Sequence, residues 1–471
     1  MKINNVLIIR PDAMGDFISI IPVIKTLKDN FPRSKVTVLG SNANKDVASY
    51  VVEMDDFINA NDYLRNYSLL IKEVKKRKFD VALVYNHDTK WALLPLFAGI
   101  KTRIGDKYRL FIRFLFNKGV YINNADHSKH VVEYNLQYLK CLGVKKFTEN
   151  ILIDYKKTKG ISKKINLMSE YIVFHVGHLG GSGGREWSVN AYVDVINKLH
   201  LYREIQVVLT GQKHFIEFAN KISQKVQNKK LILNLIDQTT ISELIEILRD
   251  AKVYVGTDTG VTHLAAACNV PCVFIMGVKA IKPIRWYPFG VPLKIIRTNV
   301  LCPYVCHFSK CKFNECIENI SADKIAESVN ELLTSKNNQC DLRQNKLDAF
   351  YKSMSVLLIY KNKETKLITD LLGKYLNEIG VRVIDINYFN IFHFAKIWRL
   401  CIKYDITIIH AVSKSSLVLA WIFKQILPVV SFVKPLVING SVKVQAKEEL
   451  IAMYLNALNE LSIKANRKYW K

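Results

Sequence analysis

Short apolar runs rich in Val and Ile alternate with helical stretches along most of the chain, and this alternation constrains the fold more than any other feature. Continuous apolar runs of this kind are typical of parallel strands that are buried on both faces. In the first third of the chain they occupy residues 6–10, 35–39, 57–60 and 80–85. Because such runs alternate with helices, the sequence predicts an α/β fold with doubly wound parallel sheets.

The same alternation starts again twice, which predicts three units. A lysine-rich stretch of low hydrophobicity, residues 151–164, is the expected linker between the first two units. The predicted domains are residues 1–160, residues 165–335, and a smaller accessory α/β unit of unknown role at residues 350–471. The later apolar runs lie at residues 171–176, 205–210, 231–235, 251–256, 355–360, 381–386 and 406–410.

The chain is strongly basic, with a formal net charge of +27 and a pI near 9.5. This balance favours an anionic partner such as a phosphorylated substrate or an acidic membrane surface. We expect no nucleic-acid partner, because the sequence has no zinc-finger or helix-turn-helix signature. With no signal sequence and no apolar run of about 18–20 residues, we expect a cytoplasmic protein, with peripheral contact to the inner membrane face as an option.

One basic stretch also contains aromatic residues. Arg103, Lys107, Arg109 and Arg113 are interleaved with Tyr and Phe side chains. This mixture could meet an acidic, lipid-bearing acceptor at a membrane face. The alternative is a surface helix with one packed apolar side.

The stretch from Val255 to Ala267 predicts a strand, a tight polar loop and an alanine-rich helix. Such a loop is the usual ligand position in an open α/β sheet, and the start of the helix suits a phosphate. The residues that carry this prediction are Asp258, Thr259, Gly260, Thr262 and His263. The alternative is that Asp258 or Thr259 only caps the helix and that His263 is an ordinary structural histidine.

The first strand is followed by a loop that ends in Gly15 and Asp16. The loop has neither the three spaced glycines of a dinucleotide site nor the Lys-Ser/Thr pair of a P-loop. Its distinctive group is the carboxylate of Asp16, which could be a general base or a helix cap.

A third loop, residues 177–188, is rich in glycine and contains Ser182 and Arg185. Backbone N–H groups and a guanidinium in such a loop could hold a phosphate. The alternative is a surface loop with no ligand.

Four of the nine cysteines lie close together in the sequence, at Cys302, Cys306, Cys311 and Cys316. Their spacing is not a standard zinc pattern. A zinc or iron–sulfur site and a set of packed, reduced thiols both stay open.

Taken together, these stretches resemble glycosyltransferase family 9, the heptosyltransferases that build the inner core of lipopolysaccharide. The resemblance covers about residues 1–335. Three motifs carry it: residues 9–16 with Pro22, His175-Val176-Gly177 with Arg185 and Trp187, and residues 256–267 with Pro271 and Gly277.

The resemblance implies a GT-B architecture, in which two Rossmann-like domains face a cleft. It implies an inverting transferase that uses no metal and no cofactor. The implied donor is a nucleotide-diphosphate sugar, with ADP-heptose as the first candidate, and the implied acceptor is an anionic glycolipid or glycan. Asp16 matches the general base. The implied donor-binding residues are Ser182, Arg185, Glu217, Asp258, Thr259, Gly260, Thr262 and His263, and Arg10, Arg103 and Arg109 are the expected acceptor contacts.

The sequence departs from the family pattern at two positions. The loop at 177–188 has glycines where the family often has hydroxyl residues, and Asp12 adds a charge near Asp16. These departures and the additional final third keep a second hypothesis open. It is a non-catalytic protein that retains the GT-B fold and binds a nucleotide-sugar or a glycan.

Overall fold

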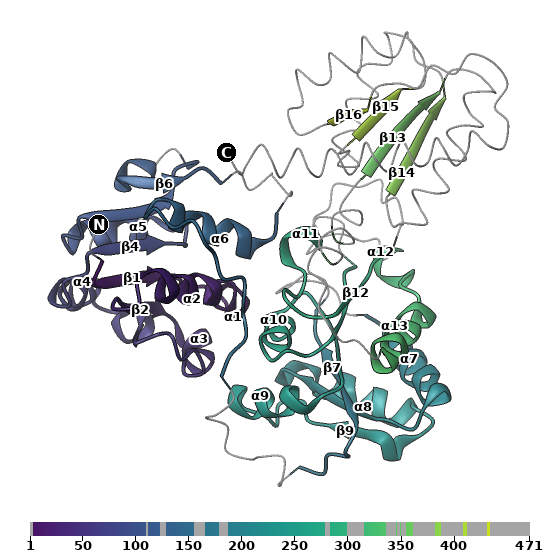
Figure 1. Cartoon of the computed structure of the whole chain (residues 1–471). Helices are drawn as coiled ribbons and strands as arrows, with labels where there is room; N and C mark the ends of the chain where they lie inside the picture. Colours follow the sequence, from purple (N-terminus) through teal and green to yellow (C-terminus); the bar gives the residue numbers. More distant parts are fainter. Residues whose placement is uncertain are drawn as a thin grey trace.

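A computed structural model describes residues 3–109, 112–122, 129–154, 165–178, 187–277, 283–298 and 315–335, together with Asn345, Ala349 and four further strands. The described chain forms three parallel sheets. The first two are the sheets of the N-terminal and C-terminal domains (Figure 1).

The N-terminal sheet has the strand order β3-β2-β1-β4-β5-β6, and every neighbouring pair is parallel. Its strands are β1 (Asn5–Ile9), β2 (Lys35–Gly40), β3 (Asp56–Asn59), β4 (Val81–Val84), β5 (Thr102–Asp106) and β6 (Lys118–Val120). The helices are α1 (Met14–Ile18), α2 (Ile21–Asn30), α3 (Asn42–Ala48), α4 (Tyr67–Lys76), α5 (Thr89–Phe97) and α6 (Val131–Lys140), with short turns η1 (Ala60–Tyr63) and η2 (Arg113–Leu115). The strand order reverses between β1 and β4, where ligands bind in open α/β sheets.

The C-terminal sheet has the order β12-β11-β10-β7-β8-β9, again parallel throughout. Its strands are β7 (Tyr171–Val176), β8 (Gln206–Gly211), β9 (Ile232–Asn234), β10 (Val253–Thr257), β11 (Cys272–Ile275) and β12 (Leu293–Ile296). The helices are α7 (Val189–Tyr202), α8 (Ile216–Lys225), α9 (Ile241–Asp250), α10 (Gly260–Ala267), α11 (Pro283–Trp286), α12 (Glu315–Glu318) and α13 (Ala322–Thr334), with turns η4 (Lys213–Phe215) and η5 (Lys229–Leu231). Here the order reverses between β7 and β10.

The two domains pack against each other, with α1 of the first facing α10 of the second (Figure 1). One continuous hydrophobic cluster includes buried residues of both helices, among them Phe17 and Leu264. Backbone hydrogen bonds join the domains where the chain crosses between them, from the Ile153 N–H to the Ala267 carbonyl at 3.1 Å and from the Asp154 N–H to the Tyr50 carbonyl at 2.9 Å. These contacts bring together the places where the two strand orders reverse, between β1 and β4 in one sheet and between β7 and β10 in the other.

The structure confirms the predicted doubly wound parallel sheets and corrects local expectations. Residues 103–113 do not form a surface helix, because residues 102–106 are strand β5 and the residues after Ile112 form η2. Gly105 explains this geometry. A Cβ there would come within 2.3 Å of the Phe116 ring, so the bare backbone lets that ring close over the strand.

The predicted interdomain linker is only partly described. Residues 151–154 lie extended along the domain junction, and the lysine-rich residues 155–164 lie outside the described residues.

A third parallel sheet has the order β14-β13-β15-β16. Its strands are β13 (Ser355–Tyr360), β14 (Arg382–Asn387), β15 (Ile408–Ala411) and β16 (Ser431–Val433). The first three occur where the sequence predicts strands, whereas the accessory role and the domain boundaries stay predictions. In the part of the chain that the structure describes, no helix is long and apolar enough to cross a membrane.

Candidate active site

The loops after β1 and β10 meet across the domain junction. A Cβ on Gly15 would lie 2.7 Å from Cδ2 of His263, and a Cβ on Gly260 would lie 3.0 Å from Cε of Met14. Only a residue without a side chain allows this approach at Gly15. The carboxylate residue Asp16 therefore directly follows the point where the N-terminal domain touches the start of α10.

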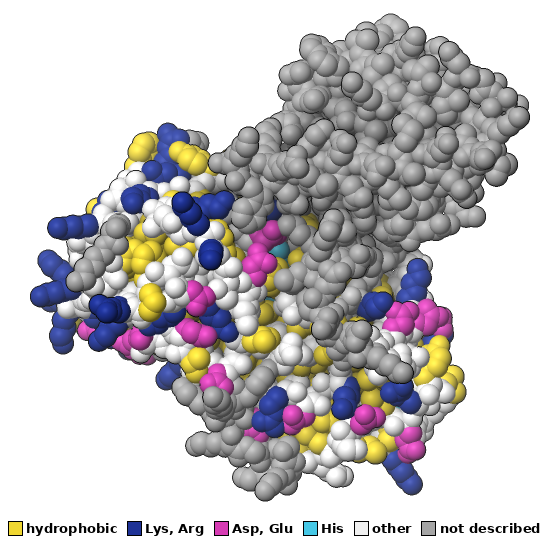
Figure 2. Space-filling model, in the orientation of Figure 1, with side chains coloured by type: hydrophobic (Ala, Val, Ile, Leu, Met, Phe, Trp, Pro, Cys, Tyr) yellow, Lys and Arg dark blue, Asp and Glu magenta, His cyan; other side chains and the backbone are white. Residues whose placement is uncertain are grey.

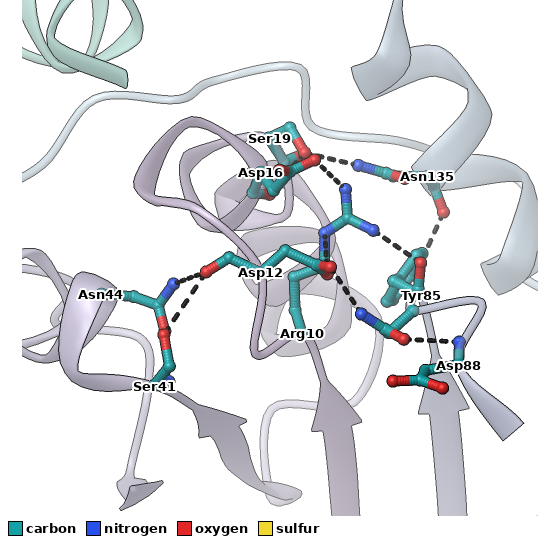
Figure 3. A network of polar contacts seen from close by, with 10 residues as sticks. Arg10, Asp12, Asp16, Ser19, Ser41, Asn44, Tyr85, Asp88 and Asn135 are labelled. Carbon is teal, nitrogen blue, oxygen red and sulfur yellow. Dashed lines mark hydrogen bonds and ion pairs between the residues drawn. The ribbon is translucent and has the colours of Figure 1, made fainter. Parts of the chain in front are cut away.

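Arg10 directly follows β1 and holds Asp16 in place. Its buried guanidinium forms an ion pair with Asp16 through Nη2 and donates from Nη1 to the Tyr85 carbonyl at 2.5 Å. Its Nε lies 3.4 Å from Oδ2 of Asp12 (Figure 3). The Asp16 side chain is 26% exposed, so the arginine fixes it without covering it.

Asp12 is the second carboxylate of this network. Asn86 donates from Nδ2 to Oδ1 of Asp12 at 2.5 Å, and Asn44 donates to the Asp12 backbone carbonyl at 2.8 Å (Figure 3). Burial raises the pKa of Asp12, the charge of Arg10 opposes that rise, and Asp16 adds to it. Arg10 thus divides its positive charge between two acids.

The backbone of α1 is also anchored from the N-terminal domain core. The Ser19 hydroxyl donates to the Asp16 carbonyl at 2.6 Å and accepts from Nδ2 of Asn135 at 2.8 Å. The Tyr85 hydroxyl in turn donates to the Asn135 carbonyl at 3.0 Å. These contacts tie the short helix of Asp16 to α6 and to the end of β4.

His263 lies on the first turn of α10, in contact with Gly15. Its Nε2 is 3.9 Å from Oδ1 of Asp258, and its ring meets the ring of Trp286 edge-on with 6.0 Å between centroids. The side chain is largely buried, yet it faces the interdomain junction rather than the core of its own sheet. An imidazole there can donate to a charged oxygen that enters between the domains.

The threonines of this turn have separate structural tasks. Thr262 is fully buried, donates from Oγ1 to the Thr257 carbonyl and lies 3.0 Å from the Tyr254 hydroxyl. Thr259 occupies the N-cap position of α10, but its side chain makes no capping hydrogen bond. Thr259 therefore does not cap the helix with its side chain, and its half-buried hydroxyl lies 3.4 Å from the Thr262 hydroxyl at the start of the helix.

Of the other predicted donor residues, the structure describes Glu217. Glu217 is exposed near the start of α8, which follows the carboxyl end of β8 through η4. Ser182 and Arg185 lie outside the described residues. The backbone just after β7 is tied to the end of β10, since Oγ1 of Thr257 donates to the His178 carbonyl at 2.9 Å.

Of the remaining predicted acceptor contacts, Arg103 bonds to backbone carbonyls of its own domain. Its guanidinium donates to the Leu115 carbonyl at 2.8 Å and to the Ile100 carbonyl at 2.9 Å. Arg109 is exposed beyond the carboxyl end of β5.

The loop after β4 adds a histidine that the sequence did not single out. His87 lies with Nδ1 3.9 Å from Oδ2 of buried Asp106. Burial lowers the pKa of His87, and the positive charge of Arg109 lowers it further. Its position in a polar loop next to the switch point was the available signal, as it was for Asn86.

Cys316 is the one member of the cysteine cluster that the structure describes, and it is half-buried on α12. Among the described residues, no group of three or more His, Cys, Asp or Glu side chains is arranged to hold a metal ion.

Comparisons with known proteins agree with this arrangement. A family model described as "Glycosyltransferase family 9 (heptosyltransferase)" matches residues 68–316, more than half of the chain. Lipopolysaccharide heptosyltransferase 3 of Escherichia coli is 26% identical over 296 residues, which cover 59% of this chain and 84% of that protein.

Solved structures of the family share the fold. The E. coli ADP-heptose LPS heptosyltransferase II superimposes with a TM-score of 0.57 at 22% identity, over 70% of this chain and 98% of that one. The glycosyltransferase family 9 protein of Veillonella parvula gives a TM-score of 0.59 at 14% identity, over 71% and 98%. With two facing Rossmann-like domains of the GT-B type and a family match over more than half of its length, the chain belongs to glycosyltransferase family 9.

Proposed function

We propose that this glycosyltransferase is an inverting, metal-independent heptosyltransferase that moves heptose, or a related sugar, from a nucleoside diphosphate to a lipopolysaccharide-type acceptor. The observation that carries the proposal is the contact of Gly15 with His263, which brings a fixed carboxylate from one domain to a helix N-terminus of the other. ADP-heptose is the first donor to test, because the fold is shared with a protein named as an ADP-heptose LPS heptosyltransferase.

In this proposal Asp16 is the general base. The acceptor hydroxyl attacks the anomeric carbon in line, its proton passes to the Asp16 carboxylate, and the bond from that carbon to the diphosphate oxygen breaks. The ion pair with Arg10 holds the carboxylate in a fixed orientation. The buried contacts of Arg10 favour a positioning role for this residue over direct contact with the acceptor.

The start of α10 receives the leaving nucleoside diphosphate. Backbone N–H groups at a helix N-terminus stabilise phosphate, and the Thr259 hydroxyl and the His263 ring lie beside them. Thr262 supports the turn from inside. Asp258, Gly260 and Glu217, with Ser182 and Arg185, stay proposed donor contacts.

The acceptor is proposed to be an anionic glycolipid at the cytoplasmic face of the inner membrane. Arg109 is the exposed cation nearest in sequence to the buried carboxylate of Asp106, and its charge acts on His87 beside the Asp16 network. This supports binding of acceptor phosphate or carboxylate groups along the N-terminal sheet edge.

Substitution of the base tests the proposal. Asp16→Asn should lower kcat with ADP-heptose and a heptose-deficient core acceptor by about 10²–10⁴-fold, because general base catalysis is lost. Binding of ADP, the nucleotide part of this donor, should persist and is measured by thermal shift. Asp46→Asn, an exposed acid on α3, is the matched control and should keep full activity.

Four results would count against the proposal. Unchanged turnover in Asp16→Asn would remove Asp16 from its role. Loss of activity with EDTA would overturn metal independence, and retention of anomeric configuration in the product would overturn inversion. Donor binding by the unmodified protein without transfer to any acceptor would favour the non-catalytic alternative.

A further inference from the structure

The outer edge of the N-terminal domain carries exposed hydrophobic side chains. Five large ones lie between residues 96 and 121: Leu96, Phe97, Tyr108, Phe114 and Tyr121. Phe114 is 77% exposed and Tyr121 is 72% exposed. We call this surface, formed by the described parts of residues 96–121, the edge surface.

The edge surface is built on ordered structure. Strand β6 ends the sheet and pairs with β5, and η2 packs against α5 and β5. Oδ1 of Asp106 accepts from the N–H groups of Tyr108 at 2.9 Å and of Ile122 at 3.2 Å. The same buried carboxylate therefore fixes the backbone at Tyr108 and at Ile122, the residue that follows Tyr121.

Charge on the edge surface has one sign. Residues 96–121 contain six Lys and Arg and a single acid, Asp106, whose side chain is only 2% exposed. Within the described residues, none of Lys101, Arg113 and Lys118 has a carboxylate at ion-pair distance, and the Arg113 guanidinium lies 4.7 Å from the centre of the Phe114 ring. Figure 2 shows hydrophobic and basic side chains side by side over the region where Figure 1 places β6.

Exposed aromatic side chains among basic residues are concentrated on the edge surface. Of the five exposed large aromatic residues recorded in the described chain, four lie in the edge surface, and the fifth is Tyr202. Tyr202 and its exposed neighbour Leu201 are followed by Arg203 and Glu204, so their surroundings carry both signs of charge.

We propose that the edge surface docks the enzyme on an anionic lipid bilayer. Phe and Tyr side chains insert at the boundary between headgroups and acyl chains, and surrounding Lys and Arg bind acidic headgroups. The docked edge includes β5, whose carboxyl end carries Asp106 beside His87 and the Asp16 network. A glycolipid anchored in that bilayer would thus present its sugar near the base, so the inference rests on and deepens the proposed function.

Co-sedimentation of the full chain with lipid vesicles tests this. We expect binding to vesicles of phosphatidylcholine with phosphatidylglycerol, weakened by salt, and no binding to phosphatidylcholine alone. The variant Lys101→Ser/Arg113→Ser/Lys118→Ser should bind on the order of 100-fold more weakly, since each basic residue contributes about fivefold. Phe97→Ser/Phe114→Ser/Tyr121→Ser should lose on the order of tenfold.

Matched controls separate the edge surface from general charge and hydrophobicity. Lys221→Ser/Lys229→Ser/Lys230→Ser removes the same charge from exposed positions of the C-terminal domain. Leu201→Ser/Tyr202→Ser removes exposed hydrophobic side chains, 81% and 54% exposed, from the end of α7. Both controls should bind vesicles like the unmodified chain.

The inference is overturned if the edge-surface variants sediment like the unmodified chain, or if the control variants lose as much vesicle binding as the edge-surface variants do. It is also overturned if the chain ignores acidic vesicles and instead binds duplex DNA through the edge surface. Thermal shift with ADP is measured on every variant. Vesicle binding lost with the ADP shift kept isolates the edge surface, whereas an absent ADP shift with vesicle binding kept counts only against the proposed donor.

Discussion

At the scale of single residues, the site depends on the contacts that Arg10 makes with two carboxylates, those of Asp12 and Asp16. Its guanidinium contacts the carboxylates of Asp12 and Asp16 and the Tyr85 carbonyl, so three acceptors fix its position. A buried arginine with two acids favours one geometry, because leaving either charge unpaired is costly. Asp16 is therefore presented to the cleft in a single orientation while part of the arginine charge is directed to Asp12.

Substitution of Asp12 tests this sharing. Asp12→Asn keeps the size of the side chain but removes one of the two carboxylates that fix Arg10, so the guanidinium holds Asp16 less firmly. We expect kcat to fall by on the order of tenfold at neutral pH while ADP binding is retained. A turnover equal to that of the unmodified enzyme, measured under the same conditions, would show that Asp12 has no influence on the base.

At the scale of elements, the strands that carry the motifs were predictable and their partners were not. The apolar runs ending at Arg10, Val176 and Gly256 predicted β1, β7 and β10, because a strand buried on both faces leaves a continuous apolar run. Asn86 and His87 could not be assigned, since their roles depend on β4 lying beside β1. The segment at 103–113 was misjudged because its alternating charges fit both a helix and the strand-and-turn that Phe116 stabilises by packing on Gly105.

Strand β7 carries a buried histidine that makes stability depend on pH. Burial lowers the pKa of His175 to about 4, and its Nδ1 lies 3.0 Å from the Thr210 hydroxyl. Because the folded protein binds this proton less tightly than the unfolded chain does, stability is lost as the pH falls below about 6.5. Between pH 7 and pH 5 the group should cost about 2 kcal/mol of unfolding free energy.

Urea denaturation at the two pH values measures this effect. His175→Gln should remove most of the pH-dependent loss, whereas His214→Gln, at an exposed position, should leave it unchanged. An identical decline of unfolding free energy in the unmodified chain and in His175→Gln would contradict the assignment.

At the scale of the whole molecule, two domains each supply half of one site. The GT-B arrangement, expected from the resemblance, is confirmed by the two six-stranded parallel sheets and by the shared fold of the solved relatives. The contact between Gly15 and His263 was not predictable from either domain alone, because it depends on how α1 and α10 pack across the junction. The roles of the cysteine loop and of the last third stay predictions.

The central claim is that Asp16 and the turn at His263 act on the same transition state. A double-mutant cycle on kcat, with Asp16→Asn, His263→Ala and the double variant, tests it most directly. Because residues that act as one unit are not additive, we predict that the double variant loses little more than the worse single variant. Losses that multiply, or single variants that both keep full turnover, would contradict a shared site.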